Sequence, residues 1–288
     1  MTVKDYPVIW LQGAGCTGCS VSLLNSASPK IQNLLLDQVV PGHQLQMKFH
    51  PTIMAGQGEP AIEVIRDTGK TEKGKYIFIV EGAVPTKDKG MFGWVGEKDD
   101  KPVTILSRVI ELGADALMTI AVGTCATFGG IPSGKPNPTG CKAVQEIFEE
   151  NGIETPLVNV PGCPPHPDWI TGTIAAIIFS GLDSLKLDEL KRPKLFFGGL
   201  IHENCQRRPY FDKNVFAKKS GEDGCLYMIG CKGPYTYADC PIRQWNNGAS
   251  WCVKAGSPCI GCVQPEFPDN TSPFYEKITF EELKCEKQ

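Results

Sequence analysis

The chain has 288 residues, of which 41% are hydrophobic and 21% charged, and these fractions exclude a disordered chain. A net charge of -3 and a pI near 5.9 exclude the basic surface that a nucleic-acid partner requires. No uncharged apolar run approaches the roughly 20 residues of a membrane-spanning helix, so we expect no transmembrane segment. Cysteine is the unusual residue type, because its count of 13 is high and odd, whereas a closed disulfide framework uses an even number.

The first residues, Met1 to Pro7, contain neither the apolar core of a signal peptide nor a twin-arginine pair. We therefore expect a periplasmic protein if a leader was removed before Met1, and a cytoplasmic one if Met1 is the native start.

The first part of the chain alternates between strand-like and helix-like segments. Short apolar runs predict strands near residues 7–13, 45–54, 75–82, 116–125 and 155–163. Apolar residues at helical spacing predict helices near residues 20–37, interrupted at Pro29, and near 59–66, 102–112, 142–150 and 168–179, with Gly113 as a C-terminal cap. This alternation is typical of a parallel sheet covered on both faces. We expect an α/β fold, with a flavodoxin-like doubly wound parallel sheet over residues 1–183.

Four cysteines fall where predicted strands end. Cys16 and Cys19 follow the first strand, Cys125 ends the fourth and Cys163 ends the fifth. Right-handed crossovers place the carboxyl ends of all parallel strands at one edge of the sheet, where open α/β proteins build their sites. We therefore expect these four thiols to converge, a placement that core packing does not require.

A nucleotide-binding motif overlaps the first two of these cysteines. The run Gly13-Ala-Gly15-Cys-Thr-Gly18 matches G-x-G-x-x-G, and Asp37 lies about where a ribose ligand is expected. This pattern supports an alternative function, a nucleotide-dependent oxidoreductase. Two thiols would crowd the approach of a pyrophosphate, however, and Asp37 continues a helical pattern instead of closing a strand. The glycines also suit a metal cluster, because backbone N–H groups in a tight turn hydrogen-bond to sulfur.

From Asp183 onward the regular pattern stops, and no long amphipathic helix follows Leu190. A segment of this length without a core of its own needs another source of stability. Two consecutive sets of metal ligands supply one, so we expect residues 184–288 to form a largely irregular, cluster-binding C-terminal domain. The sets are His202, Cys205, Cys225 and Cys231, and then Cys240, Cys252, Cys259 and Cys262.

Zinc is the alternative to iron-sulfur clusters, because it suits the H-x2-C and C-x2-C spacings. It would make the chain a zinc-stabilised scaffold protein with a Rossmann-like domain. Structural zinc sites are usually compact modules with short knuckles, however, and a zinc site across the edge of a parallel sheet has no obvious role.

Seven motifs together resemble the small subunit of nickel-iron hydrogenases, in chain order over residues 7–275. They are WLQGAGCTGCSVSLLN at 10–25, VEG at 80–82, AVGTCATFGGIP at 121–132, NVPGCPPHPDW at 159–169, IHENC at 201–205, GCKGP at 230–234 and ADCPIRQWNNGASWCVKAGSPCIGC at 238–262. The resemblance implies the electron-transfer subunit of a heterodimeric hydrogenase, an oxidoreductase that oxidises molecular hydrogen reversibly. It also implies that the catalytic nickel-iron centre lies in a partner large subunit, so that this chain has no catalytic residues.

The resemblance further assigns the ligands of three clusters that relay electrons. Cys16, Cys19, Cys125 and Cys163 would hold a proximal four-iron cluster, and His202, Cys205, Cys225 and Cys231 a distal one. The distal cluster would lie where a redox partner docks, such as a cytochrome or a ferredoxin-like carrier. Cys240, Cys259 and Cys262 would hold the medial cluster.

Cys252 departs from the pattern of many members of this family, which have proline there and a medial cluster of three irons. A fourth cysteine ligand predicts a medial four-iron cluster, the pattern of the nickel-iron-selenium subgroup. We therefore expect three 4Fe-4S clusters.

Two cysteines remain, and three charged residues have open roles. Cys141 is expected to be an ordinary small thiol, and Cys285 a free thiol in a polar tail.

Glu81 is expected as a solvated or interface carboxylate, with proton transfer as the alternative. Arg207 and Arg208 follow a distal ligand, where they would either steer an acidic redox partner or remain solvated.

Overall fold

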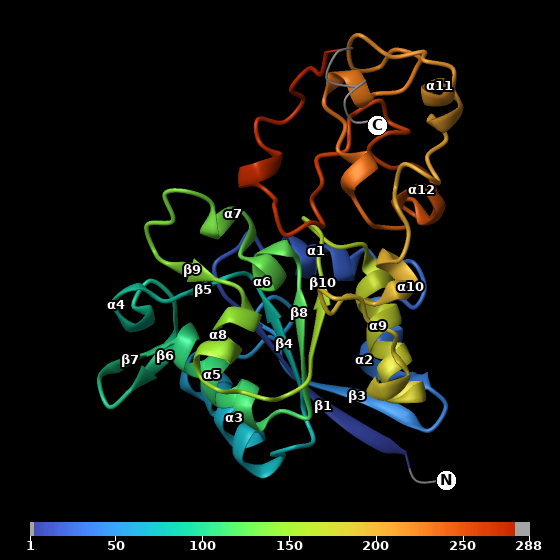
Figure 1. The fold of residues 1–288 in the computed structure, drawn as a ribbon. Coiled ribbons are helices and arrows are strands. Elements are labelled where there is room, and N and C mark those ends of the chain that lie inside the picture. Colours follow the sequence, from blue (N-terminus) through green and yellow to red (C-terminus); the bar gives the residue numbers. More distant parts are fainter. Residues whose placement is uncertain (1–2, 280–288) are drawn as a thin grey trace. The chain divides into compact units, whose positions relative to one another are not determined.

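The structure is a computed structural model that describes residues 3–279. The chain divides into two compact units, Met1–Pro193 and Lys194–Gln288, each with its own elements (Figure 1). The boundary between these units lies somewhat later than residue 183, where we expect the first domain to end.

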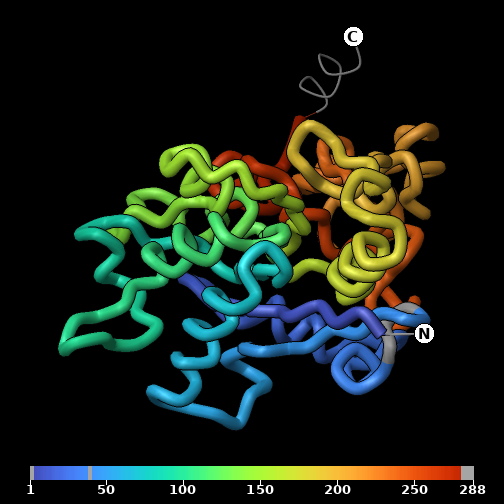
Figure 2. Tube along the Cα trace, turned by 90° about the horizontal axis from the view of Figure 1, so that it is seen from below, coloured from blue at the N-terminus to red at the C-terminus, as the bar shows by residue number. Residues whose placement is uncertain are grey.

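The first unit is built on one sheet with the strand order β10-β8-β4-β1-β3-β2. Its parallel strands are β1 (Lys4–Gln12), β3 (His43–Phe49), β4 (Ile77–Glu81), β8 (Met118–Val122) and β10 (Leu157–Val160), and β2 (Gln38–Val40) pairs antiparallel at one edge. Figure 2 shows β1 and β3 running side by side. Counted along the chain, the parallel strands lie in the order 2-1-3-4-5, as in flavodoxin-like folds, which confirms the predicted fold class.

Helices cover both faces of this sheet. The helical elements of this unit are α1 (Gly18–Leu24), α2 (Ile31–Leu36), α3 (Gly58–Thr71), α4 (Lys87–Gly90), α5 (Ile105–Asp115), α6 (Thr124–Phe128), α7 (Gly130–Ser133), α8 (Val144–Glu150), α9 (Pro167–Ser180) and the 3-10 turn η1 (Leu182–Ser184). Figure 1 shows α3, α5 and α8 on one side of the sheet and α2 and α9 on the other. Ile9, Phe78 and Val80 are buried with Ile65 of α3 and Val109 of α5 in one core, which fixes the sheet edge that carries the cysteines.

Two local predictions in this unit are wrong. Residues 102–104 belong to a hairpin, β6 (Trp94–Lys98) with β7 (Lys101–Thr104), so the helix begins only at Ile105. Gly113 does not cap the helix, which continues to Asp115; a Cβ there would lie 2.6 Å from the Phe148 ring. A second small ladder joins β5 (Val84–Pro85) to β9 (Cys141–Lys142).

The second unit is largely irregular, as predicted. Its elements are α10 (Lys194–Phe197), α11 (Arg208–Asp212), α12 (Cys240–Arg243) and the 3-10 turns η2 (Tyr227–Ile229), η3 (Gly233–Tyr235) and η4 (Asp269–Thr271). Its small apolar cluster contains Cys225 and Tyr227 packed against Phe211 and Phe216. Within residues 3–279, no helix combines the length and hydrophobicity needed to cross a membrane.

Candidate metal-cluster sites

The four cysteines of the first unit lie at the carboxyl ends of neighbouring strands. Cys16 follows β1 and Cys19 lies in the first turn of α1. Cys125 lies in α6, directly after β8, and Cys163 follows β10. Because β10, β8, β4 and β1 are adjacent in the sheet, the strand order brings these thiols to one edge, as the sequence predicts.

The charges of these thiols interact. Burial raises the pKa of the Cys19 thiol, and the charges of Glu81, Cys125, Cys16 and Cys163 raise it further. Burial also raises the pKa of Cys125 to about 12, and the charge of Cys163 adds to the effect. Thiols that resist ionisation need a positively charged group nearby to be held as thiolates, and a metal ion or cluster supplies it. Four cysteines gathered at one sheet edge are the ligands that a four-iron cluster takes, so this donor set fits a metal cluster.

Three glycines leave room around the sulfurs. A Cβ at Gly123 would lie 2.4 Å from Cys19 Sγ, and one at Gly18 would lie 3.0 Å from Cys16 Sγ. A Cβ at Gly130 would lie 3.1 Å from Cys125 Sγ. Side chains at these positions would occupy the space around the sulfurs.

Glu81 anchors the turn that carries Cys19. Its carboxylate is 3% exposed and accepts hydrogen bonds from Trp10 Nε1 at 3.0 Å and from the Cys19 amide at 3.0 Å. The Ser20 backbone amide and hydroxyl and the Gln12 side-chain amide also donate to it. The expectation of a solvated or interface carboxylate is therefore wrong, because these donors compensate its burial.

The nucleotide-like glycines serve contacts within the protein. The backbones at Ala14 and Ala83 exchange two hydrogen bonds of 2.8 Å, and a Cβ at Gly13 would lie 2.4 Å from the Ala83 carbonyl oxygen. Asp37 directly follows α2 and accepts a hydrogen bond from Asn33, so it does not close a strand as a ribose ligand would.

The second ligand set lies within the second unit. His202 is 9% exposed, and its Nε2 is buried without a hydrogen-bond partner among residues 3–279. An imidazole nitrogen in this state suits a metal ligand, since buried polar atoms otherwise have partners. Burial raises the pKa of Cys225 to about 12, and the charges of Cys231 and Cys205 raise it further. These contributions place the three thiols near one another.

Arg207 and Arg208 are engaged within the chain. The Arg207 guanidinium donates to the carbonyl oxygens of Glu222 and Gly224, at 2.7 Å each, and its amide donates to Cys205 Sγ at 3.4 Å. Arg207 thus links the loop of Cys205 to the segment that precedes Cys225. Arg208 pairs with Asp212 at 2.8 Å. Arg207 is therefore not simply solvated, because its hydrogen bonds hold the two ligand-bearing segments together.

The third set is also contained in the second unit. Burial raises the pKa of Cys240 well above its ordinary value, and the charges of Cys262, Cys259, Cys252 and Asp239 raise it further. Cys240 is therefore near all three of the other cysteines, including Cys252.

A single metal ion holds its ligands at about 2.0 to 2.3 Å. Among residues 3–279, no three His, Cys, Asp or Glu side chains are grouped tightly enough to hold one.

Cys141 lies apart from the sets, buried in β9 with Thr139 Oγ1 3.1 Å from its sulfur, and Cys285 lies outside the described residues.

Sequence reasoning missed Gly123, where only glycine leaves space for the Cys19 sulfur, and Thr236, whose hydroxyl lies near Cys259. It also missed an exposed apolar group, Met91, Phe92 and Trp94. The run of large apolar residues between turn-forming ones in GMFGW was the available signal for that group.

Two protein families match the chain. Residues 16–177 match the family NADH ubiquinone oxidoreductase, 20 Kd subunit, and residues 197–275 match the C-terminal family of the NiFe/NiFeSe hydrogenase small subunit. The chain is 47% identical to the periplasmic NiFeSe hydrogenase small subunit of Desulfomicrobium baculatum, over 94% of this chain and 87% of that protein. It is 39% identical to the periplasmic NiFe hydrogenase small subunit 1 of Nitratidesulfovibrio vulgaris, over 93% and 81%.

Solved structures agree with these matches. A reduced, active NiFeSe hydrogenase from Desulfomicrobium baculatum superimposes with a TM-score of 0.90 at 46% identity, over 96% of this chain and 100% of that chain. The recombinant NiFeSe hydrogenase from Desulfovibrio vulgaris Hildenborough gives a TM-score of 0.88 at 45% identity, over 96% and 99%.

Proposed function

Since the chain belongs to the family of nickel-iron and nickel-iron-selenium hydrogenase small subunits, we propose that twelve of its side chains hold three four-iron clusters. The chain is the electron-transfer subunit of a heterodimeric hydrogenase, and it binds iron-sulfur clusters. When bound, such clusters accept and donate single electrons, which links hydrogen oxidation in the large subunit to an external acceptor.

The convergence of Cys16, Cys19, Cys125 and Cys163 at the carboxyl edge of the sheet carries the proposal. The sheet order brings together residues that are far apart in sequence, and their charges interact. We assign them the proximal cluster. Glu81 holds the Cys19 amide, and so it orients one ligand before the metal arrives.

Cys252 decides the type of the medial cluster. The charge of Cys252 acts on Cys240, as do the charges of Cys259 and Cys262. Four thiols are therefore available at this set. Four thiolates match the ligand requirement of a four-iron cluster.

His202, Cys205, Cys225 and Cys231 would hold the distal cluster. Glu203, Asn204 and Gln206, beside the first two of these ligands, are exposed. We assign this polar surface to the docking of the redox partner, a cytochrome or a ferredoxin-like carrier.

The large subunit is the obligate partner, and the first unit offers it an exposed apolar group. Its residues are Met91, Phe92 and Trp94, which are 43%, 53% and 53% exposed. Their backbone packs closely against α5, because Cβ atoms at Gly90 and Gly93 would lie 2.8 Å from Leu106 and 3.2 Å from Ile105. Exposed aromatic residues are typical anchors of protein interfaces. Cys16 is exposed as well, so the proximal site lies at a surface where the large subunit would also bind.

Metal analysis of the purified heterodimer tests the proposal. We expect about twelve irons, with as many acid-labile sulfides, beyond the iron of the catalytic nickel-iron centre, because three four-iron clusters require them. Mössbauer spectra should assign these irons to four-iron clusters. Two or three zinc ions without sulfide would instead support the scaffold function, and NADH binding with no sulfide would support the nucleotide-dependent one.

A further inference from the structure

The second and third ligand sets are joined by two hydrogen-bonded segments of the second unit, residues 231–236 and residues 259–261. The amide of Cys259 donates to Cys231 Sγ at 3.3 Å, although the two cysteines belong to different sets. The amide of Lys232 donates to the carbonyl oxygen of Cys259 at 2.7 Å. Two hydrogen bonds therefore connect these segments, at the proposed ligands Cys231 and Cys259.

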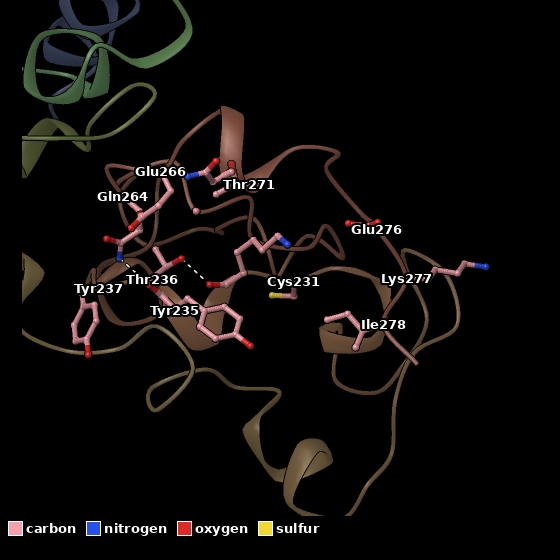
Figure 3. Close-up of a pocket in the computed structure, with 13 residues that line it drawn as sticks. Cys231, Tyr235, Thr236, Tyr237, Gln264, Glu266, Thr271, Glu276, Lys277 and Ile278 are labelled. Atoms are coloured by element: carbon pink, nitrogen blue, oxygen red, sulfur yellow. Dashed lines mark hydrogen bonds between the residues drawn. The ribbon is translucent and has the colours of Figure 1, made fainter. Parts of the chain in front are cut away.

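Thr236 lies in the first of these segments, and its hydroxyl is near the sulfur of the proposed ligand Cys259. It is 1% exposed, and its Oγ1 donates to the carbonyl oxygen of Lys232 at 2.6 Å. Cys259 Sγ lies 3.9 Å from the same oxygen, with the thiol as donor. Figure 3 shows Thr236 beside Tyr235, with its hydrogen bond drawn.

Metal binding must change this arrangement. The thiol proton of Cys259 leaves when its sulfur becomes a metal ligand, and the thiolate can then only accept hydrogen bonds. The hydroxyl of Thr236 holds the remaining proton of the pair. Hydrogen bonds to charged acceptors are roughly twice as strong as neutral ones, and this favours donation to the sulfur.

The carbonyl group of Lys232 tolerates the loss of this bond. The amide of Tyr235 also donates to that carbonyl oxygen, at 3.1 Å. Turning the hydroxyl toward Cys259 therefore leaves no carbonyl oxygen without a donor, which removes the main cost of the change.

We propose that Thr236 is a positioning residue whose hydroxyl donates to the Cys259 thiolate and raises the reduction potential of the cluster that this sulfur holds. Reduction adds negative charge to the cluster and its thiolates, so a hydrogen bond to a thiolate stabilises the reduced form more than the oxidised one. The inference rests on the proposed assignment of Cys259 as a medial ligand. The amide of Gly261, 3.4 Å from the same sulfur, is unchanged by substitutions at Thr236.

Redox titration of the intact heterodimer, followed by electron paramagnetic resonance, tests this role. Thr236→Val should shift the midpoint potential of the medial cluster to more negative values and leave the other two unshifted. Thr236→Ser, which keeps the hydroxyl, should restore the wild-type value. Thr173→Val is the matched control, because Thr173 is fully buried and its hydroxyl donates to the carbonyl oxygen of Trp169, also at 2.6 Å.

An unshifted medial potential in fully loaded Thr236→Val protein would overturn the inference. If that variant does not take up its full iron, Thr236→Ala replaces it. The inference would also be overturned if Thr236→Val and Thr236→Ala both lost the medial cluster while Thr236→Ser kept it. Thr236 would then be needed for cluster assembly and not for the potential. Iron and sulfide in the wild-type protein keep the two proposals apart, since their absence contradicts the proposed function before any variant is compared.

Discussion

Replacing Gly123 by alanine tests whether the first ligand set needs the space that this glycine leaves. Gly123 has φ +88, and a Cβ there would lie 2.4 Å from Cys19 Sγ, whereas ordinary contact begins near 3.4 Å. The sulfur would have to move by about 1 Å, and overpacking of this kind costs about 1 to 3 kcal/mol. With ψ 154, this backbone lies in a region that essentially only glycine adopts, which adds about 1 to 3 kcal/mol for a residue with a Cβ. We therefore expect Gly123→Ala to lose about 2 to 6 kcal/mol of unfolding free energy in total.

Gly181→Ala separates the two costs. Gly181 has φ 79 and ψ 159, close to the values at Gly123, and no atom of the described residues lies within 4 Å of the position that a methyl group there would take, so only the backbone cost applies. We expect Gly123→Ala to lose the proximal cluster, about four of about twelve irons, while Gly181→Ala keeps all of them. Iron analysis and low-temperature resonance spectra of both heterodimers measure this. Full iron and an unchanged proximal signal in Gly123→Ala would refute the steric reasoning.

Three further substitutions test other parts of the molecule. Cys252→Pro should convert the medial site to a three-iron cluster with its own resonance signal when oxidised, since the fourth ligand is gone. Phe92→Ala should weaken binding of the large subunit by at least about tenfold, as the loss of an interface anchor does, measured by titration of the separated subunits. His50→Gln should make the free energy of unfolding depend less on pH in acid. Burial lowers the pKa of His50 to about 4, so the folded state resists protonation of this side chain and the unfolded state does not. Wild-type stability should then fall by about 2 kcal/mol more than that of the variant between pH 7 and pH 5, in urea unfolding.

Each of these predictions has an outcome that contradicts it. An unchanged medial signal in Cys252→Pro would mean that Cys252 is not a ligand. Phe179→Ala is the control for docking, because Phe179 is 73% exposed on α9; equal weakening by both variants would argue against a specific anchor at Phe92. Parallel stability curves for wild type and His50→Gln between pH 7 and pH 5 would show that His50 is not buried in its neutral form.

Much of the fold was predictable because it depends on local patterns. Apolar runs ending in glycine predict β1, β4 and β8 correctly, and their order follows from right-handed crossovers. The same reasoning failed at Gly113, where the glycine is needed for the Phe148 ring and not for a helix end. Local patterns cannot distinguish these two uses, because the ring comes from another helix.

Side-chain partners were less predictable than side-chain positions. The sequence places Glu81 at the cysteine edge, but its five donated hydrogen bonds depend on β1 and α1 being packed beside β4. The guanidinium of Arg207 likewise reaches carbonyl groups that follow it by 15 and 17 positions. Such contacts depend on loop paths that no periodicity encodes.

The sequence by itself determined the class of fold and the candidate ligand residues, because strand periodicity and cysteine spacing are local properties of the chain. Only the tertiary structure decided which groups surround each sulfur: the glycine at 123, the carboxylate at 81 and the hydroxyl at 236. The physical reason is that hydrogen bonds and van der Waals limits act over a few ångströms, between residues that the fold brings together from distant parts of the sequence.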